Sequence, residues 1–432
     1  MNKRKFTVKP PHHFLYSTLA LAIAGLSAGS ASAAPIDSWN LDNVGVVPNV
    51  VDGVSGGVST IYDQAPVGST AASSGYIKWE EPEGASPGLK VVNDAPAGDS
   101  GAQVDNCIMA AGAATCNGPF QSGKRFKLDR TAFDPIDLVF DLSTGSLTDG
   151  NDGLYRVFQK YGNNTGSALG GFNIGLGFGI GSDFIASSAN DGLSFVNFGA
   201  DPKGSEFSSV FAEGLFGEDE ERDRLRGYFS GERSGFNLDW VNEDLFQTTG
   251  LFGGQYGYEA LFGDWMSYSM APDGYFYDDD GNPATDNVLM AHYDASLDKW
   301  IMNRAIDADG NIVPTAVGNE GVQYDSILDV ENALKQQALV SGLVLATCPD
   351  VPVSGTACLA GTGEIEDLAK FNVTYFIDPV DFDSANQSTF TLRLSGSARA
   401  VPEPGALALF ATGLGLLLGG RRRAGRSKTA AD

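Results

Sequence analysis

The sequence predicts a mainly β fold, a β-sandwich or jelly-roll-like domain with one or two helices. Three observations support this prediction. Short segments rich in β-branched and aromatic residues recur along the chain, and Gly, Pro, Asn and Asp bound them. The turns come too often for helices of ordinary length. With 55 glycines in 432 residues and yet 42% apolar residues, the chain has the composition of a globular, loop-rich protein.

The clearest strands lie in the first half of the chain. We expect them at 74–80, 89–93, 136–142 and 155–161. The segment 171–181 alternates strictly between apolar residues and small or polar ones, and a period of two over that length predicts a strand. One face of this strand carries only small or polar residues, namely Asn173, Gly175, Gly177 and Gly179.

The glycine face of segment 171–181 has almost no side chains, so another part of the chain must approach its backbone closely. A bent strand or a tightly packed neighbour explains this face better than a ligand platform does. The glycine spacing is G-x-G-x-G and no helix start follows it, so the segment is not a dinucleotide-binding fingerprint.

One amphipathic helix is expected near the end of the domain. Ser326 can cap its first turn, and Gly342 is a natural stop. Four apolar residues share one face at helical spacing: Ile327, Val330, Leu334 and Ala338. The segments 371–377 and 389–394 are then the last two strands.

The body of the protein, residues 34–400, is longer than a usual single domain, and no linker rich in Pro or Ser divides it. One large β-rich domain and two subdomains, at about 34–205 and 206–400, both fit this length.

The charge balance excludes some classes of partner. The chain has 28 basic and 54 acidic residues, a formal net charge of −26, and residues 34–404 keep 19 of the basic residues and 53 of the acidic ones. Nucleic acids and anionic membranes need a cationic surface, so the sequence predicts neither as a partner.

The N-terminus has the order of a secretory signal peptide. Lysines and an arginine precede an apolar run at 19–26, and a small-residue A-x-A stretch follows with Ala31, Ala33 and Ala34. The apolar run is too short for a transmembrane helix. We therefore expect residues 1–33 to be removed after Ala33 during export by the secretion machinery.

The C-terminus, residues 401–432, combines a proline break, an apolar segment and a basic tail. The apolar segment 406–420 is long enough only for a short transmembrane helix. The flanking residues are Pro402, Glu403 and Pro404 on one side and Arg421, Arg422 and Arg423 on the other.

These three features, in this order, resemble the PEP-CTERM sorting signal of Gram-negative bacteria that make exopolysaccharide. The resemblance implies that an exosortase, an integral membrane cysteine transpeptidase, cuts near Pro404 after a transient stay in the inner membrane. The protein then reaches the cell surface or the extracellular matrix. The alternative is an ordinary single-pass anchor that holds a periplasmic domain.

The four cysteines form two local pairs in the sequence, Cys107 with Cys116 and Cys348 with Cys358. An exported chain meets an oxidising compartment, so two disulfides are expected. Four cysteines allow three pairings, and the short Gly- or Pro-containing loops favour the local one. The cysteines are too far apart in the sequence for a zinc site.

No catalytic signature stands out. His292 is the one histidine left after signal cleavage, it lies in a segment that alternates like a strand, and no nucleophile elbow accompanies it. We expect a structural or surface histidine and no catalytic residue. A glycosidase needs only two carboxylates, so the many acidic residues leave that activity open.

Two acidic segments have the ligand types of weak calcium sites, with Asp278, Asp280 and Asn282 in one and Asp307, Asp309 and Asn311 in the other. Neither matches the EF-hand spacing. The alternative is that each Asp-Gly-Asn makes a β-hairpin turn, which the flanking strand patterns favour. A turn can also bind the ion, so Ca²⁺ stays an option.

Segments 39–44, 75–80, 106–109 and 277–283 resemble those of the choice-of-anchor bacterial surface proteins, including their type F. That resemblance implies a surface domain without a known activity. We therefore expect a non-enzymatic matrix protein associated with exopolysaccharide or biofilm. The alternative is a secreted carbohydrate-binding module or glycosidase, with Ca²⁺ assistance as an option and with sugar-stacking aromatic residues Trp240, Tyr256, Tyr258 and Trp265.

Overall fold

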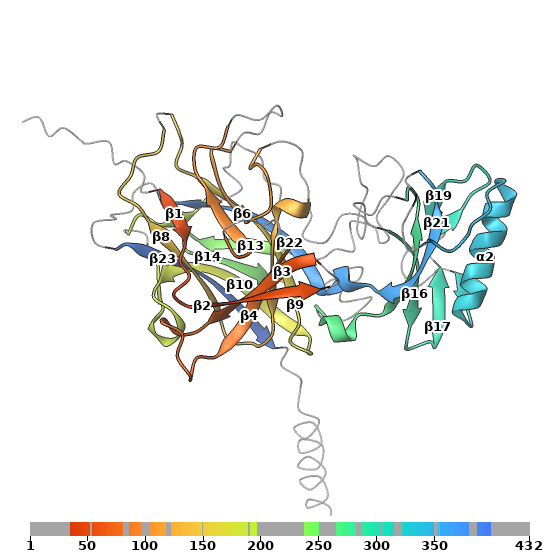
Figure 1. The fold of residues 1–432 in the computed structure, drawn as a ribbon. Coiled ribbons are helices and arrows are strands. Elements are labelled where there is room, and N and C mark those ends of the chain that lie inside the picture. The colour runs from red at the N-terminus through yellow and green to blue at the C-terminus, as the bar shows by residue number, and fades with distance from the viewer. Residues whose placement is uncertain are drawn as a thin grey trace, which may run out of the picture. The chain divides into compact units, whose positions relative to one another are not determined.

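The protein is mainly β, with several antiparallel sheets and one α-helix in the part of the chain that the structure describes (Figure 1). The structure is a computed structural model that describes residues 35–51, 54–80, 86–96, 104–117, 122–148, 150–188, 191–196, 237–249, 265–281, 287–302, 304–314, 322–349, 353, 355–379 and 387–398. The expected signal peptide, sorting signal and Asn282 lie outside these residues. None of the described helices has the length and apolar character needed to cross a membrane.

Sheet A has seven described strands in the order β1, β8, β23, β10, β14, β13, with β11 paired to β10. Their bounds are Ile36–Trp39 (β1), Ile136–Leu142 (β8), Leu169–Phe178 (β10), Ile185–Ala186 (β11), Asn237–Asn242 (β13), Leu245–Thr249 (β14) and Thr389–Ala398 (β23). Phe140 of β8 pairs with Phe390 of β23, and their rings stack with centroids 5.2 Å apart.

Sheet B has nine described strands, in the order β12, β22, β9, β7, β4, β3, β2, with β6 paired to both β5 and β9. Their bounds are Val44–Val51 (β2), Val54–Tyr62 (β3), Ser73–Glu80 (β4), Leu89–Val92 (β5), Asn106–Ala110 (β6), Phe126–Arg130 (β7), Tyr155–Asn163 (β9), Ser194–Phe195 (β12) and Lys370–Asp378 (β22). The start of β9 pairs parallel with β6 and its end pairs parallel with β7, whereas the other pairs are antiparallel.

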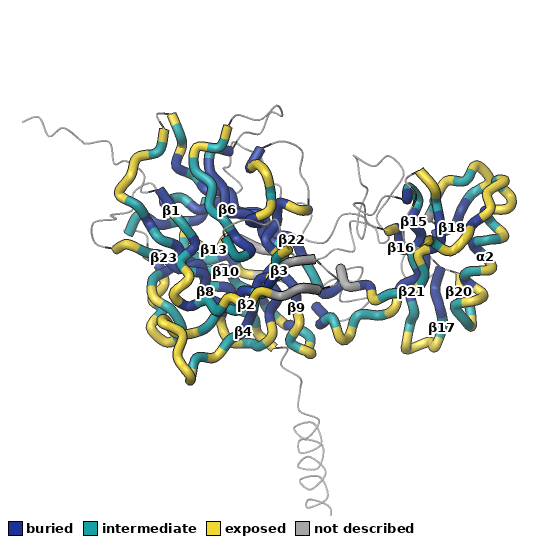
Figure 2. The backbone as a smooth tube through the Cα atoms, viewed as in Figure 1, coloured by how far each residue is buried: buried dark blue, intermediate teal, exposed yellow. Residues whose placement is uncertain are grey.

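Sheets A and B contribute side chains to one hydrophobic core. In β10 the buried residues Phe172, Ile174 and Leu176 alternate with less buried ones, as the period of two predicts, whereas β6, β9 and β22 are buried along almost their whole length. Phe172 of β10 meets Phe371 of β22 edge-on at 5.1 Å, and Phe246 of β14 lies 6.2 Å from Tyr375 of β22. Figure 2 shows the central strands largely buried and the loops around them exposed.

The glycine face of β10 is closely packed, as expected. A Cβ atom on Gly177 would lie 2.3 Å from the carbonyl oxygen of Ile185 and 2.5 Å from the ring of Phe184. Such distances leave no room for any side chain. Gly177 therefore allows β11 and the segment before it to pack against this strand, whereas a Cβ atom on Gly175 would make only ordinary contacts, the nearest at 3.7 Å from the carbonyl oxygen of Asp244.

A third sheet of five described strands has the order β20, β17, β16, β15, β21, and a two-stranded hairpin follows β17. Their bounds are Asp273–Asp278 (β15), Val288–Asp294 (β16), Lys299–Met302 (β17), Arg304–Ile306 (β18), Ile312–Pro314 (β19), Val322–Tyr324 (β20) and Cys358–Glu364 (β21). Helix α2, Ile327–Val340, buries Val330, Leu334 and Ala338 in a core shared with this sheet. Short 3-10 helices lie at Ser122–Lys124 (η1), Gly181–Asp183 (η2), Tyr268–Met270 (η5) and Glu366–Ala369 (η7).

Helix α2 begins at the expected cap. The Oγ atom of Ser326 accepts a hydrogen bond from the backbone N–H of Asp329 at 3.3 Å. We expect Ser326→Ala to lower the free energy of unfolding by about 1 kcal/mol, because the N–H loses its acceptor. Denaturant unfolding measures this, and Ser326→Asp, which keeps an acceptor, is the control. Equal stability of Ser326→Ala and the parent would contradict the cap's role.

Both local disulfides form in the structure, Cys107–Cys116 and Cys348–Cys358, with sequence separations of 9 and 10. Cys107 and Cys116 belong to a small buried cluster with Phe158 and Phe376. The first disulfide therefore holds the segment after β6 against one end of the face of sheet B that points away from sheet A. This segment covers that end of the face.

A division into subdomains near residue 205 does not follow the strand pairing. Strands β13, β14, β22 and β23 come after that position, yet they pair with strands of sheets A and B that precede it. The third sheet is formed by a segment inserted between β14 and β22. Hydrogen bonding between strands that are distant in the sequence decides which strands share a sheet. The composition along the chain does not reveal this pairing.

Candidate functional site

The first acidic segment is a turn in which the carboxylate of Asp278 caps the backbone. Asp278 ends β15 and is buried, and its Oδ1 accepts from the N–H groups of Asp280 at 3.1 Å and Gly281 at 2.6 Å. Gly281 has φ of +62°, a conformation that favours glycine. Carboxylate oxygens of Asp278, Asp279 and Asp280 lie within 4.8 Å of one another.

The second acidic segment is the expected hairpin turn between β18 and β19. Oδ1 of Asp307 accepts from the N–H groups of Asn311 at 2.8 Å and Asp309 at 2.9 Å. The hydrogen bond from the Asn311 backbone is the main cause that lowers the pKa of Asp307. The second segment thus has the expected hairpin-turn geometry, whereas the first continues at Asn282 into residues outside the described part of the chain. A calorimetric titration with Ca²⁺ tests whether either segment binds the ion.

His292 lies in β16 and is buried, with 5% of its surface exposed. Burial lowers its pKa to about 4, and the nearby charge of Asp294 opposes this shift. The residue is therefore neutral in the folded protein at pH 7.

The depressed pKa of His292 predicts acid sensitivity. Above pH 6.5 the residue is neutral in both states; as the pH falls toward 4 the unfolded state takes up the proton and the folded state does not. We expect this to cost up to about 3 kcal/mol of unfolding free energy between pH 7 and pH 4. Urea unfolding of the parent and of His292→Gln over this range measures it. Equal losses in the two proteins would contradict the prediction.

The aromatic residues considered for sugar stacking do not form one surface. Trp265 is fully buried and packs on Tyr161 and Phe371, so it belongs to the core and cannot stack on a sugar. Trp240 of β13 is 36% exposed. Tyr256 and Tyr258 lie outside the described residues. The expectation for Trp265 was wrong, because a single tryptophan does not reveal from sequence which face of a sheet it occupies.

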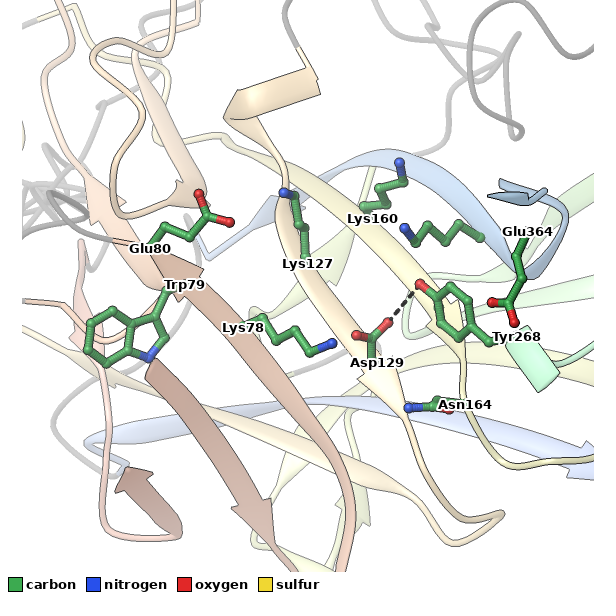
Figure 3. A pocket seen from close by; sticks show the side chains of 11 residues that line it. Lys78, Trp79, Glu80, Lys127, Asp129, Lys160, Asn164, Tyr268 and Glu364 are labelled. Carbon is green, nitrogen blue, oxygen red and sulfur yellow. Dashed lines mark hydrogen bonds between the residues drawn. The ribbon is translucent and has the colours of Figure 1, made fainter. Parts of the chain in front are cut away.

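The structure instead places a polar groove on the outer face of sheet B. Its volume is about 480 Å³. Strands β4, β7, β9 and β22 form its floor, and Figure 3 shows lysine side chains of these strands in it. We refer to this pocket as the lysine groove. Its lining residues are Lys78, Trp79, Glu80, Lys127, Asp129, Lys160, Gly162, Asn164, Tyr268, Glu364 and Lys370.

Backbone register brings three of the lysines into one row. Lys78 pairs with Lys127 across β4 and β7, and Lys127 pairs with Lys160 across β7 and β9. Because neighbouring strands lie about 4.8 Å apart, the backbone positions of this lysine row span about 10 Å. Leu128 follows Lys127 and Tyr161 follows Lys160, and both are buried in the core shared with sheet A. Trp79, which follows Lys78, is not part of that core. The lysine row therefore lies on the outer face.

The next row contains a carboxylate held in place by a tyrosine. Asp129 pairs with Gly162, and the hydroxyl of Tyr268 donates a hydrogen bond to its Oδ1 at 3.2 Å (Figure 3). A Cβ atom on Gly162 would lie 2.1 Å from that Oδ1 and 2.9 Å from the tyrosine oxygen. Because Gly162 has no side chain, there is room for the hydrogen bond between Tyr268 and Asp129. Lys370 lies over the Tyr268 ring at 5.2 Å.

The groove can bind and orient polar groups of both kinds. Its ammonium groups attract anions, and its carboxylates accept hydrogen bonds from hydroxyl groups. Sequence reasoning missed it: Lys78 and Lys160 fall within two predicted strands, but no local pattern states that these strands are joined through Lys127 of a third. The alternation within each strand could have predicted that each lysine lies on the outer face. That the three lysines lie side by side follows only from the register between the strands.

Comparison of the chain with protein-family models, with curated proteins and with solved structures finds no match.

Proposed function

We propose that this protein is an exported, non-enzymatic protein of the bacterial cell surface or extracellular matrix. In this proposal an exosortase removes the C-terminal signal, and the mature protein associates with exopolysaccharide in a biofilm. The observation that carries the association is the lysine groove. In a chain with 28 basic and 54 acidic residues, four lysines line one open pocket on a sheet face.

The non-enzymatic character is supported by the chemistry of the groove lining. The lining residues include no histidine, cysteine or serine that could act as a base or nucleophile. His292 is buried in the third sheet, and the four cysteines are in disulfides. The lysines and carboxylates of the lining are suited to binding charged and polar groups, and the carboxylates are also the groups that a glycosidase would use.

We also propose that sheets A and B form a β-sandwich with jelly-roll-like connections. The shared core supports this, as does the way in which consecutive strands alternate between the sheets. The chain passes from β7 in sheet B to β8 in sheet A, back to β9, and again to β10. Strands β22 and β23 alternate in the same way.

The mass of the mature protein from its native host, measured together with its cell fraction, tests the export and sorting. We expect a mature chain that begins near Ala34 and ends near Pro404, in the surface or matrix fraction. An intact chain with Arg421, Arg422 and Arg423 in the inner membrane would contradict exosortase sorting and make the protein a periplasmic domain on an anchor.

A glycosidase is the second candidate, because the same groove contains three carboxylates, Glu80, Asp129 and Glu364. Two carboxylic groups on either side of a sugar suffice for hydrolysis. Release of reducing ends from acidic and neutral polysaccharides at high protein concentration tests it. Activity that disappears in Asp129→Asn would replace the binding proposal with an enzymatic one.

A further inference from the structure

We infer that the lysine row binds the carboxylate groups of an acidic polysaccharide, a polymer that contains uronic acids. This inference rests on the proposed association with exopolysaccharide and names the class of polymer that the groove would take. The row is formed by Lys78, Lys127 and Lys160, which follow one another in register across β4, β7 and β9.

The first argument is the energetic cost of the row. Like charges directly opposite each other on neighbouring strands destabilise a sheet. Here two such pairs follow in succession, Lys78 with Lys127 and Lys127 with Lys160, in a protein rich in carboxylates. A ligand with repeated negative charges that crosses the strands places opposite charges along the row, in addition to the carboxylates that already lie in the groove. The row therefore fits a polyanion better than a single small anion.

The second argument is that the groove also offers hydrogen-bond acceptors beside the row. Asp129 lies two positions along β7 from Lys127, and Glu80 lies two positions along β4 from Lys78, so both share the lysines' face. These carboxylates would repel a ligand that has only acceptor groups. A uronic acid carries a carboxylate for the lysines and hydroxyl groups that can donate to the exposed Glu80, whereas Asp129 is buried and its Oδ1 already accepts from Tyr268.

The same chemistry disfavours DNA. A DNA backbone offers phosphate oxygens and no hydroxyl donors, and its dense charge requires a wide cationic surface. The groove has about 480 Å³ and belongs to a chain with net charge −26. A flexible polymer with sparser charge can enter the groove with less repulsion from the rest of the protein.

Binding of three polymers by the protein, expressed as the full chain, tests the inference. The probes are alginate as a polyuronate, dextran as a neutral glucan, and duplex DNA. The test variant is Lys78→Gln with Lys127→Gln. The matched control is Lys299→Gln with Lys335→Gln, which removes the same charge from two ion pairs outside the groove, an exposed one with Asp325 and a partly buried one with Glu331.

We expect the parent to bind alginate, with an affinity that falls as salt is added. The groove variant should bind alginate about tenfold more weakly, since each exposed charge contact contributes up to about 1 kcal/mol. The control variant should bind as the parent does. Equal weakening in both variants would overturn the inference, as would binding of DNA as tight as that of alginate.

Two further outcomes separate this inference from the proposed function. Binding of dextran as strong as that of alginate, unchanged in the groove variant, would leave the association with polysaccharide standing and overturn the role of the lysine row. Binding to no polysaccharide at all would overturn the association as well. Circular dichroism of both variants checks that each retains the parent's fold.

Discussion

Replacing Arg130 with alanine is expected to lower the free energy of unfolding by about 3 to 5 kcal/mol. Arg130 ends β7 and is fully buried. Its Nη1 donates to the carbonyl oxygens of Ala132 at 2.8 Å and Asp134 at 2.7 Å, and its Nη2 donates to that of Leu394 at 2.7 Å.

The size of the effect follows from what the guanidinium connects. Leu394 belongs to β23 of sheet A, so one side chain links the ends of both sheets. Its Nε also donates to the hydroxyl of Tyr161, whose pKa burial raises. Truncation leaves a cavity, removes the donor to the buried oxygen of Leu394 at a cost of about 1 to 3 kcal/mol, and removes two part-buried hydrogen bonds to Ala132 and Asp134.

Denaturant unfolding of Arg130→Ala beside Lys127→Ala measures the effect. Lys127 lies on the same strand but is exposed, so its loss should change stability by less than about 0.5 kcal/mol. If Arg130→Ala fails to fold, Arg130→Lys, which keeps the charge and some donors, gives an intermediate loss. A loss below about 1 kcal/mol in Arg130→Ala would contradict the linking role.

Replacing Trp265 with alanine is expected to cost about 3 to 5 kcal/mol of unfolding free energy. Trp265 is 0% exposed, and its ring lies 4.5 Å from that of Phe371 and 5.6 Å from that of Tyr161. Its backbone also forms an isolated bridge with Leu169 at the start of β10. The indole therefore fills the core where the two sheets meet the segment that enters the third sheet.

Trp240→Ala is the matched control. Trp240 is 36% exposed on β13, so its removal should change stability by less than about 1 kcal/mol. Thermal or denaturant unfolding compares the two variants. Similar small losses of unfolding free energy in both variants would mean that Trp265 is not in the core. Trp265 would then be a candidate for sugar stacking again.

Arg130 and Trp265 both belong to the core that lies behind the lysine groove. Tyr161, which contacts both Arg130 and Trp265, is the residue after Lys160 on β9. Core packing on one face of β9 thus fixes the position of a lysine on the other face. Variants in this core should weaken polymer binding only to the extent that they unfold the protein.

Local sequence was sufficient for the elements whose interactions are local. Strand β10 follows from the alternation within 171–181, although it ends at Phe178, the start of α2 follows from Ser326, and the turn at Asp307 follows from the pattern Asp-Gly-Asn. In each case the interactions that decide the structure join residues a few positions apart. The two disulfides are of the same kind, because both close short loops.

The sequence by itself thus determined a mainly β chain, its one described α-helix, its hairpin turns and its acidic surface. The tertiary structure decided the rest: the return of β22 and β23 to the first two sheets, the burial of Trp265, and the row of Lys78, Lys127 and Lys160. The physical reason is that strand register is set by hydrogen bonds and packing between residues far apart in the chain. A pattern within one strand shows on which face of the sheet a side chain lies. Only the pairing with neighbouring strands shows which other side chains lie beside it.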